Sequence, residues 1–558
     1  MCGIVGYVGA QQAAPILLEG LQKLEYRGYD SAGIAVLDGS TIELAKACGE
    51  IKNLLAKTHD GSDLHGYIGL GHTRWATHGA PTEANAHPHV SNDGKFAIVQ
   101  NGIIENFMEL REMLQAKGFR FHSETDTEVI VHLLDMYYTG DGNLKDTVMK
   151  TLGRLEGSYA IGILCADCPE QMFLARNGCP LIIGVGAGEN FFASDVTALV
   201  SHTKNVVYLD DGELAEVRAD GYTVFDCTGK PIEKPVSRVA WDIEAAEKGG
   251  YEHFMLKEIM EQPRAIKSTL DPRVKDHRVV FDELKMTDAQ LMGFNKIMIT
   301  ACGSAFYAGQ AGKYALEKLT HIPVDADLAS EFRYRDPIVD EHTLMIIISQ
   351  SGETADTIAA IREAQSKGAY VLSIVNVVGS TIARISDDVI YTWAGPEIAV
   401  ATTKGYTTQV SVLYLLALYL GEKRGCLSRE EAAKLTDDLM ILPQMVQRAI
   451  DLNPQIAQLA ERYKNNPSLF FIGRNVDYAV CMEGSLKLKE ISYLHSEAYA
   501  AGELKHGTIA LIEENRLVIA VACYEPLFDK TMSNVKEVKA RGARVLGVAL
   551  EGNRAIYS

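Results

Sequence analysis

The thiol of Cys2 is the side chain of this sequence best placed to act as a nucleophile. It stands directly after Met1, at the start of the run Cys2-Gly3-Ile4-Val5-Gly6. Removal of Met1 would place a free α-amine beside the sulfur, and such an amine has a reference pKa of about 7.7–8.0. It could therefore accept the thiol proton near neutral pH without a histidine. The alternative is that Cys2 is a small apolar residue of a first strand.

Three further places in the first 235 residues carry groups suited to an amino-acid substrate. Arg74 ends a predicted strand, and its guanidinium matches an α-carboxylate. Asn101-Gly102 follows the predicted strand 96–100, where an amide and a backbone N–H can form an oxyanion hole. Asp126 lies where a helix begins and could bind an ammonium group. The alternatives are a surface ion pair for Arg74, a hairpin turn for Asn101-Gly102 and a helix N-cap for Asp126.

Together with Cys2, these residues resemble the class II glutamine amidotransferases. The likeness is carried by residues 2–6 (CGIVG), 26–33 (YRGYDSAG), 71–79 (GHTRWATHG) and 101–102 (NG). It implies a four-layer αββα, N-terminal-nucleophile glutaminase domain, in which Cys2 attacks the glutamine amide and Asn101 and Gly102 hold the oxyanion. The residues implied to bind the amino-acid end of glutamine are Arg74, Thr77, His78 and Asp126. Trp75 is similar to the family's residue that gates the passage of ammonia.

A repeat organises the second half of the chain. From about residue 294, apolar strands alternate with amphipathic helices, which predicts parallel α/β sheets. The strand at 296–299, its glycine and its helix recur from residue 469, and the helix at 357–368 recurs at 531–542. In this register the chain ends before the counterpart of the first copy's last strand and helix. We therefore expect two copies of one sheet unit, the second incompletely recorded.

One loop of the first copy has the composition of a phosphate site. Residues 349–354 (SQSGET) lie between a buried strand and a helix, so hydroxyls and backbone N–H groups meet at a helix N-terminus. Because the loop has no lysine, it is not a nucleotide P-loop. A serine/threonine helix cap is the alternative. The matching loop 523–526 (CYEP) lacks these hydroxyls, so only the first copy is expected to bind phosphate.

The second copy carries ionisable residues instead. Lys487 and Glu490 are spaced i, i+3 and share a helix face, and His506 follows in the sequence. A carboxylate and a histidine suit the proton transfers that interconvert a ketose and an aldose. A surface ion pair and a loop histidine are the alternatives.

Residues 349–354, 395–404 (GPEIAVATTK) and 487–492 (KLKEIS) resemble paired sugar-isomerase (SIS) domains. Joined to the Cys2 domain, this order resembles the isomerizing glutamine–fructose-6-phosphate aminotransferases in their bacterial form. The resemblance implies amination and isomerisation of D-fructose 6-phosphate by L-glutamine, giving D-glucosamine 6-phosphate and L-glutamate, the first step toward UDP-N-acetylglucosamine. It also implies a homodimer that needs no metal or organic cofactor.

By the same likeness, Glu490 is the isomerisation base, His506 opens the sugar ring and Lys487 assists at a sugar hydroxyl. The implied sugar-phosphate site comprises Ser304, Ser349, Gln350, Ser351, Thr354, Val400 and Thr402. In the family a lysine of the C-terminal tail forms a Schiff base with the ketose, and no residue after Ala549 fits that role. Two alternatives therefore stay open: a Cys2 domain serving another acceptor, and a glutaminase-competent or non-catalytic sugar-phosphate-binding protein.

Composition and pattern supply the elements that must position these residues. The 558 residues are 47% hydrophobic and 23% charged, as in large globular proteins. We expect domains at 1–235 (glutaminase), 291–425 (first SIS) and 455–558 (second SIS, truncated), with a linker at 236–290. Strands are predicted at 4–8, 33–37, 96–100, 159–165, 181–185 and 206–209, and helices at 14–24 and 105–117.

The charge balance and the cysteines limit the partners. A net charge of −19 argues against a nucleic-acid or membrane-surface partner. The longest apolar run, 410–420, is too short for a bilayer, which needs ~20 residues. Ten cysteines are too few for a disulfide scaffold and fit a reducing cytoplasm. The single CxxC, Cys165 to Cys168, is interpreted as structural.

Overall fold

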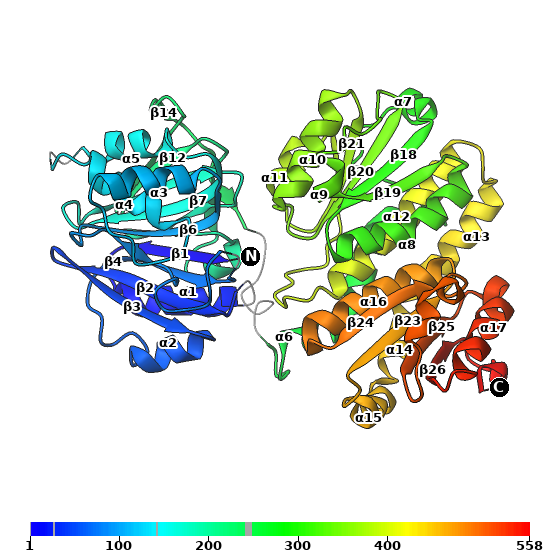
Figure 1. Cartoon of the computed structure of the whole chain (residues 1–558). Helices are drawn as coiled ribbons and strands as arrows, with labels where there is room; N and C mark the ends of the chain where they lie inside the picture. Colours follow the sequence, from blue (N-terminus) through cyan, green and yellow to red (C-terminus); the bar gives the residue numbers. More distant parts are fainter. Residues whose placement is uncertain (1, 26–27, 77, 141–142, 240–247, 558) are drawn as a thin grey trace. The chain divides into compact units, whose positions relative to one another are not determined.

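The computed structural model describes residues 2–25, 28–76, 78–140, 143–239 and 248–557. The chain divides into two compact units, Met1–Glu247 and Lys248–Ser558, and each is described by itself (Figure 1).

Two antiparallel sheets form the centre of the first unit. The first has eight strands in the order β15 (Ser237–Arg238), β11 (Asn205–Tyr208), β9 (Ile182–Val185), β10 (Asn190–Ala193), β1 (Gly3–Val8), β4 (Ile68–Arg74), β2 (Ser31–Asp38) and β3 (Thr41–Cys48). The second has seven, in the order β14 (Pro231–Ile232), β13 (Gly221–Phe225), β12 (Leu214–Arg218), β8 (Gln171–Asn177), β7 (Gly157–Cys165), β6 (Phe96–Ile104) and β5 (His89–Val90).

Helices cover the outer faces of both sheets (Figure 1). These are α1 (Ala13–Leu24) and α2 (Ile51–Lys57) on the eight-stranded sheet, and α3 (Phe107–Ala116), α4 (Glu128–Tyr137) and α5 (Leu144–Leu152) on the other. Apolar side chains such as Leu70, Val99 and Phe192 pack between the two sheets. Separate apolar clusters join each sheet to its helices. The predicted four-layer αββα arrangement is confirmed.

The register of β6 corrects one prediction. Asn101 and Gly102 do not follow this strand; they lie inside it, opposite Ala160 and Tyr159 of β7. The hairpin-turn alternative is therefore excluded. The sequence pattern also did not indicate the short helices α2 and α5.

The second unit contains two parallel sheets. The first has the order β19 (Val324–Leu328), β18 (Lys296–Ala301), β20 (Thr343–Ser349), β21 (Tyr370–Val375) and β22 (Asp388–Tyr391). The second has the order β24 (His495–Ala500), β23 (Ser468–Gly473), β25 (Leu517–Ala522) and β26 (Arg544–Ala549). Taken in chain order, the four strands of the second sheet have the same neighbours as the first four strands of the first sheet. This shared order confirms the internal repeat.

Helices connect and flank these strands. In and around the first sheet they are α7 (Asp288–Gly293), α8 (Ser304–Thr320), α9 (Ala329–Phe332), α10 (Ala355–Ser366), α11 (Thr381–Ile385) and α12 (Lys404–Lys423). The others are α13 (Arg429–Met440), α14 (Leu442–Ile450), α15 (Asn453–Tyr463), α16 (Val476–Ser492) and α17 (Phe528–Lys539). Helices α8 and α16 occupy equivalent positions and pack against each other.

The expected connecting segment 236–290 contains regular structure. It includes α6 (Phe254–Leu270) and a hairpin of β16 (Val274–Lys275) and β17 (Arg278–Val279). Ile266 and Leu270 of α6 join the apolar core that contains Leu416 of α12. Helix α6 therefore forms part of the second unit's core, whereas β15 at the start of the segment pairs in the first unit's eight-stranded sheet.

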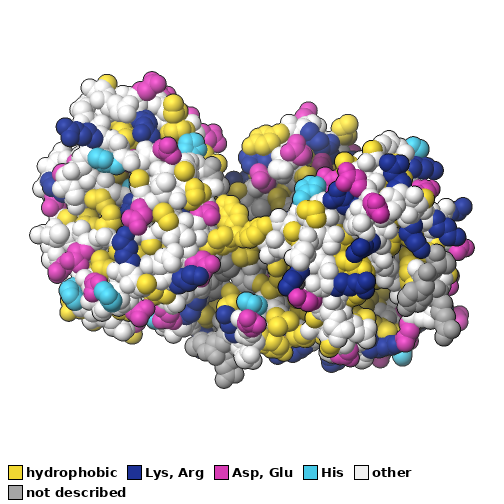
Figure 2. All heavy atoms as spheres, turned by 60° about the horizontal axis from the view of Figure 1, so that its bottom comes forward, with side chains coloured by type: hydrophobic (Ala, Val, Ile, Leu, Met, Phe, Trp, Pro, Cys, Tyr) yellow, Lys and Arg dark blue, Asp and Glu magenta, His cyan; other side chains and the backbone are white. Residues whose placement is uncertain are grey.

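Hydrophobic side chains also reach the surface of this unit. Ile441, Met445, Leu452 and Ile456 on and beside α14 and α15 are exposed. Figure 2, which brings the lower side of Figure 1 forward, shows hydrophobic side chains among charged ones on this face. No helix among the described residues is long and apolar enough to cross a membrane.

Candidate active site

The thiol of Cys2 is held by the backbone of Trp75. Cys2 precedes β1, and β1 pairs with β4 so that Gly3 lies opposite Thr73. The Trp75 N–H donates to Cys2 Sγ at 3.3 Å, and the Trp75 carbonyl oxygen lies 3.6 Å from the sulfur. Burial raises the pKa of the Cys2 thiol, although the bond to Trp75 acts in the opposite direction. A thiol in this environment needs a base to become a nucleophile.

Asn101 and Gly102 reach the same place from the other sheet. The Asn101 Nδ2 donates to the Cys2 carbonyl oxygen at 3.0 Å. Gly102 has φ 112°, and a Cβ there would lie 2.1 Å from the Ser158 carbonyl oxygen. Only glycine fits such a position without backbone movement. The two predicted oxyanion-hole residues thus adjoin the residue that carries the thiol.

The guanidinium of Arg74 is buried, with 4% of the residue exposed, which excludes a surface ion pair. It donates to the carbonyl oxygens of Gly79 at 3.0 Å and Ala80 at 3.2 Å, and also to that of His78. Desolvation lowers the pKa of Arg74, while the charges of Cys2, Asp30 and Asp126 raise it. Arg74 therefore shapes the 78–80 turn and places a cation near the Cys2 thiol.

Asp126 is not the N-cap of α4, because Thr127 holds that position. Its buried carboxylate accepts the Ile104 N–H at 2.8 Å. The His78 ring packs edge-on against Phe107, with centroids 4.7 Å apart. The indole of Trp75 is 39% exposed and meets Tyr29 edge-on at 5.2 Å. Thr77 lies outside the described residues.

Sequence reasoning did not single out three buried histidines behind Asn101. The His72 and His87 rings stack at 4.2 Å, and His87 meets His89 at 4.8 Å. Burial lowers the pKa of all three, that of His72 to about 3. The spacing of His87 and His89 was an available signal, because alternate residues of an extended chain share a side.

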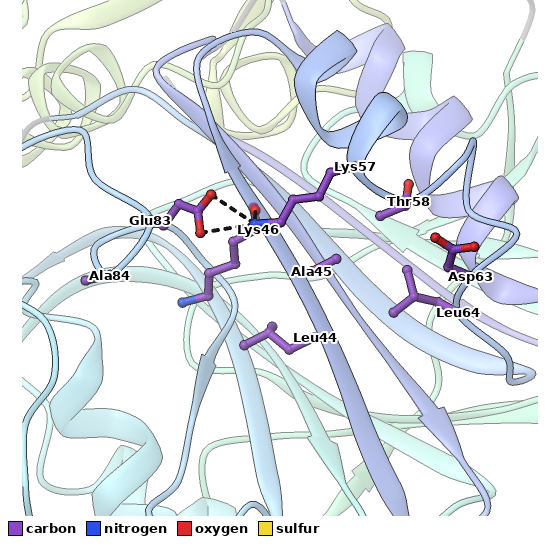
Figure 3. Close-up of a pocket in the computed structure, with 9 residues that line it drawn as sticks. All are labelled: Leu44, Ala45, Lys46, Lys57, Thr58, Asp63, Leu64, Glu83 and Ala84. Atoms are coloured by element: carbon purple, nitrogen blue, oxygen red, sulfur yellow. Dashed lines mark hydrogen bonds and ion pairs between the residues drawn. The ribbon is translucent and has the colours of Figure 1, made fainter.

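A polar hollow of about 540 Å³ opens between β3, α2 and the 82–86 turn of the same unit. Lys57 bonds Glu83 there at 2.9 Å, and the Lys46 amine extends away from that pair (Figure 3). Burial lowers the pKa of Lys46 to about 8. None of the residues that line this hollow belongs to the predicted site.

In the second unit, the loop between β20 and α10 presents the predicted hydroxyls. Ser349 Oγ accepts the Gly352 N–H at 3.0 Å, and Ser351 Oγ accepts the Glu353 N–H at 3.3 Å. Thr354 is the N-cap of α10 but makes no side-chain capping bond. The Gln350 carbonyl oxygen accepts the Asn376 N–H at 3.2 Å. The cap alternative thus fails for Thr354, whose hydroxyl does not serve the helix.

The residues before α12 have different roles. Thr402 Oγ1 donates to the carboxylate of Glu397, which also accepts the N–H groups of Thr403 at 2.8 Å and Gly405 at 3.0 Å. Val400 is exposed. The Glu397 carboxylate therefore accepts hydrogen bonds from the N–H groups at the start of α12. The Thr402 hydroxyl donates to the same carboxylate.

On α16, Lys487 bonds Glu490 at 2.6 Å and lies 3.7 Å from Glu483. Burial raises the pKa of Glu483 to about 7, against the opposing charge of Lys487. Neither buried carboxylate oxygen of Glu483 has a hydrogen-bond partner among the described residues. Helix α8, which begins at Ser304, packs against α16, which carries the Lys487–Glu490 pair. His506 is exposed in a short 3₁₀ helix, Leu504–His506, and no described contact joins its side chain to Glu490.

The equivalent loop of the second copy is already occupied by a side chain. Asp477 Oδ2 accepts the N–H groups of Cys523 at 3.0 Å and Tyr524 at 2.9 Å. In the part of the chain that the structure describes, no group of three or more His, Cys, Asp or Glu residues could hold a metal ion.

Comparisons with known proteins first show the class of protein to which this chain belongs. Residues 50–234 match the glutamine amidotransferase domain, and residues 290–419 and 463–558 match the SIS domain. A solved C-terminal domain of glucosamine-fructose-6-phosphate aminotransferase from Francisella tularensis is 37% identical, with a TM-score of 0.53. The match covers 56% of this chain and 92% of that one. The chain is therefore a glutamine amidotransferase joined to SIS domains.

Relatives matching almost the whole chain narrow the class. Glutamine–fructose-6-phosphate aminotransferase [isomerizing] from Clostridium tetani is 53% identical over 557 residues, covering 99% of this chain and 91% of that protein. The enzyme of the same name from Caldanaerobacter subterraneus is 54% identical over 554 residues, with the same coverage. The chain belongs to the isomerizing glutamine–fructose-6-phosphate aminotransferase family.

Proposed function

We propose that this enzyme transfers the amide nitrogen of L-glutamine to D-fructose 6-phosphate and isomerises the product to D-glucosamine 6-phosphate. One observation supports the glutaminase part of this proposal: Cys2 accepts hydrogen bonds from the Trp75 N–H and from the Asn101 amide. Family membership supports the choice of acceptor.

In the proposed hydrolysis, loss of Met1 frees the α-amine of Cys2, which takes the thiol proton. The thiolate then attacks the glutamine Cδ, and the Asn101 amide and the Gly102 N–H hold the oxyanion that forms. The amine returns the proton to the departing nitrogen, giving ammonia and a glutamyl thioester that water hydrolyses to glutamate. Trp75, beside the sulfur, controls the exit of ammonia.

Substrate binding follows from the charges. Arg74 offers a cation to the α-carboxylate of glutamine, and Asp126 offers an anion to its ammonium group. Thr77 and His78 complete this amino-acid site. The proximity of Arg74 to the charges of Cys2 and Asp126 supports this assignment.

In the sugar half, the hydroxyls and amides of the β20–α10 loop bind the phosphate. We assign this role to Ser304, Ser349, Gln350, Ser351, Thr354, Val400 and Thr402. Glu490 moves the proton between C1 and C2, Lys487 holds that carboxylate and assists at a sugar hydroxyl, and His506 opens the ring. The packing of α8, which begins at Ser304, against α16 supports one site made from both sheet copies.

We further propose that the enzyme is a cytoplasmic homodimer. For its domains we propose a glutaminase at 1–235 and SIS domains at 291–425 and 455–558; α6 and the β16–β17 hairpin, which lie between them in the sequence, belong to the second unit.

The test is Cys2→Ala, assayed for glutamine hydrolysis and for fructose 6-phosphate binding. We expect hydrolysis to be lost and sugar binding to stay within about twofold, because the thiol has no part in binding a sugar phosphate. Intact mass gives an independent check, since active protein must lack Met1. Hydrolysis by a protein that retains Met1 would refute the mechanism, and loss of both activities in Cys2→Ala would refute two independent sites.

A further inference from the structure

The oxyanion hole depends on which way the Asn101 amide faces. A carboxamide can occupy two orientations related by a flip, one presenting N–H₂ and the other a carbonyl oxygen. An oxygen turned toward a developing oxyanion would repel it, so one orientation supports hydrolysis and the other opposes it. The contacts of Asn101 decide between them.

His72 fixes that orientation through its proton. The His72 Nε2 lies 3.0 Å from Asn101 Oδ1 and 3.1 Å from the Gln100 carbonyl oxygen. Both partners are acceptors, so Nε2 must carry the proton. The Asn101 oxygen is thereby held toward His72, and its Nδ2 is left to face Cys2, whose carbonyl oxygen it meets at 3.0 Å.

The ring of His72 is itself fully buried and constrained. It stacks on His87 at 4.2 Å, and the buried His72 Nδ1 has no hydrogen-bond partner among the described residues. No second contact therefore competes for the proton on Nε2. Burial also keeps the ring neutral at ordinary pH, because the pKa of His72 is lowered to about 3.

The stacking partner is held in turn. His87 Nδ1 accepts the Gln100 N–H at 3.3 Å, so its proton resides on Nε2, which lies 3.3 Å from Thr127 Oγ1. That hydroxyl donates to Gln100 Oε1 at 2.7 Å. These hydrogen bonds hold the His87 ring, on which the His72 ring stacks.

We propose that His72 is a positioning residue for glutamine hydrolysis, holding the Asn101 amide with its N–H₂ group toward the reacting oxygen. This inference rests on the proposed function of Cys2 and Asn101. The side-chain hydrogen bonds of His72 among the described residues go to Gln100 and Asn101, so it acts through Asn101.

The experiment compares His72→Phe, which retains a ring for stacking, with His72→Gln, which restores an N–H donor. We expect His72→Phe to lower kcat for glutamine hydrolysis about 10²-fold, since losing an oxyanion-hole donor costs roughly 10²–10³. KM for glutamine should stay within about threefold, because Arg74 and Asp126 are unchanged. His72→Gln should recover at least about tenfold of the lost kcat.

A double substitution separates positioning from general damage. In an Asn101→Ala background, His72→Phe should cause no further loss of kcat, because the residue through which it acts is gone. His202→Leu removes another histidine stacked on a core phenylalanine of the same unit and should leave kcat within about twofold. Thermal melting of each variant monitors folding, and His72→Leu replaces His72→Phe if the latter does not fold.

Two results would overturn the inference: unchanged kcat in the apolar His72 variant, or a multiplicative loss in the Asn101→Ala background. Either is distinguishable from failure of the proposed function. If wild-type protein hydrolyses no glutamine, the function fails and the inference with it; if wild type is active, only the role of His72 is in question.

Discussion

The two sheet copies of the second unit share a fold but differ in what occupies one loop. In the first copy, the β20–α10 loop carries Ser349, Ser351 and Thr354, and the Thr354 hydroxyl does not cap the helix. In the second copy, Asp477 binds the two loop amides of Cys523 and Tyr524. Because a carboxylate of the chain already fills this position, a phosphate would meet repulsion and no available amides.

This difference shows how two copies of one sheet can take different roles in one site. We propose that the first copy holds the phosphate and the second supplies the acid and base groups on α16. The helices α8 and α16, which follow the first strand of each copy, pack together. Duplication thus allows ligand binding and proton transfer to be optimised on separate copies.

The largest effect should come from the second copy's carboxylate. We expect Glu490→Gln to lower the isomerisation rate about 10²–10⁴-fold, since it removes a general base, with sugar-phosphate affinity within about threefold. Rates of product formation and calorimetric binding give the two quantities. Glu513→Gln, which alters an exposed carboxylate of the same copy, is the control. A rate within threefold of wild type in Glu490→Gln would remove the proposed base.

A smaller effect is expected in the first copy's loop. Ser351→Ala should weaken fructose 6-phosphate binding about tenfold, because a hydrogen bond to a charged group contributes about 1.5–3 kcal/mol. The change at the equivalent position of the other copy, Glu525→Ala, should leave affinity unchanged. Equal losses of affinity from both substitutions would contradict the proposal that only the first copy's loop binds the phosphate.

Asp477 provides the converse test. Asp477→Ala leaves the Cys523 and Tyr524 amides without their acceptor and should cost about 1 kcal/mol of stability. Sugar-phosphate affinity should be unchanged. Chemical unfolding of the second unit checks the first statement and calorimetry the second. Asp477→Asn retains an oxygen acceptor and should lose less stability; a gain of affinity for the sugar phosphate in Asp477→Asn would contradict an occupied loop.

The smallest effect concerns pH. The pKa of Glu483 is raised to about 7, mainly by burial, whereas an unfolded glutamate titrates near 4.3. Between these values the folded state binds the extra proton, so the contribution of Glu483 to stability falls as pH rises through this window. We expect Glu483→Gln to raise the melting temperature more at pH 8 than at pH 5. An equal shift of the melting temperature at both pH values would contradict a raised pKa of the buried Glu483 carboxylate.

Much of the framework could be predicted because it depends on local pattern. The strand at β1, the helix α1 and the repeat of sheet units follow from residues close in sequence, whose apolar spacing reports the element. The turn that begins at Arg74 and the hydroxyl-rich loop at 349–354 are likewise contiguous. Helix α6 was missed because it packs its apolar side chains amid many charged residues.

The sequence by itself therefore determined the kinds of sheet and the two chemistries of the chain, and it predicted Cys2 as the nucleophile. Only the tertiary structure decided that Asn101 reaches Cys2 from within β6, that His72 bonds its amide and that Asp477 fills the second loop. These contacts join residues separated by 99, 29 and 46 positions. These contacts could not be predicted because they depend on long-range packing. Which strands and helices pack together decides the partner of each buried polar group, and the local periodicity of the sequence carries no information about that packing.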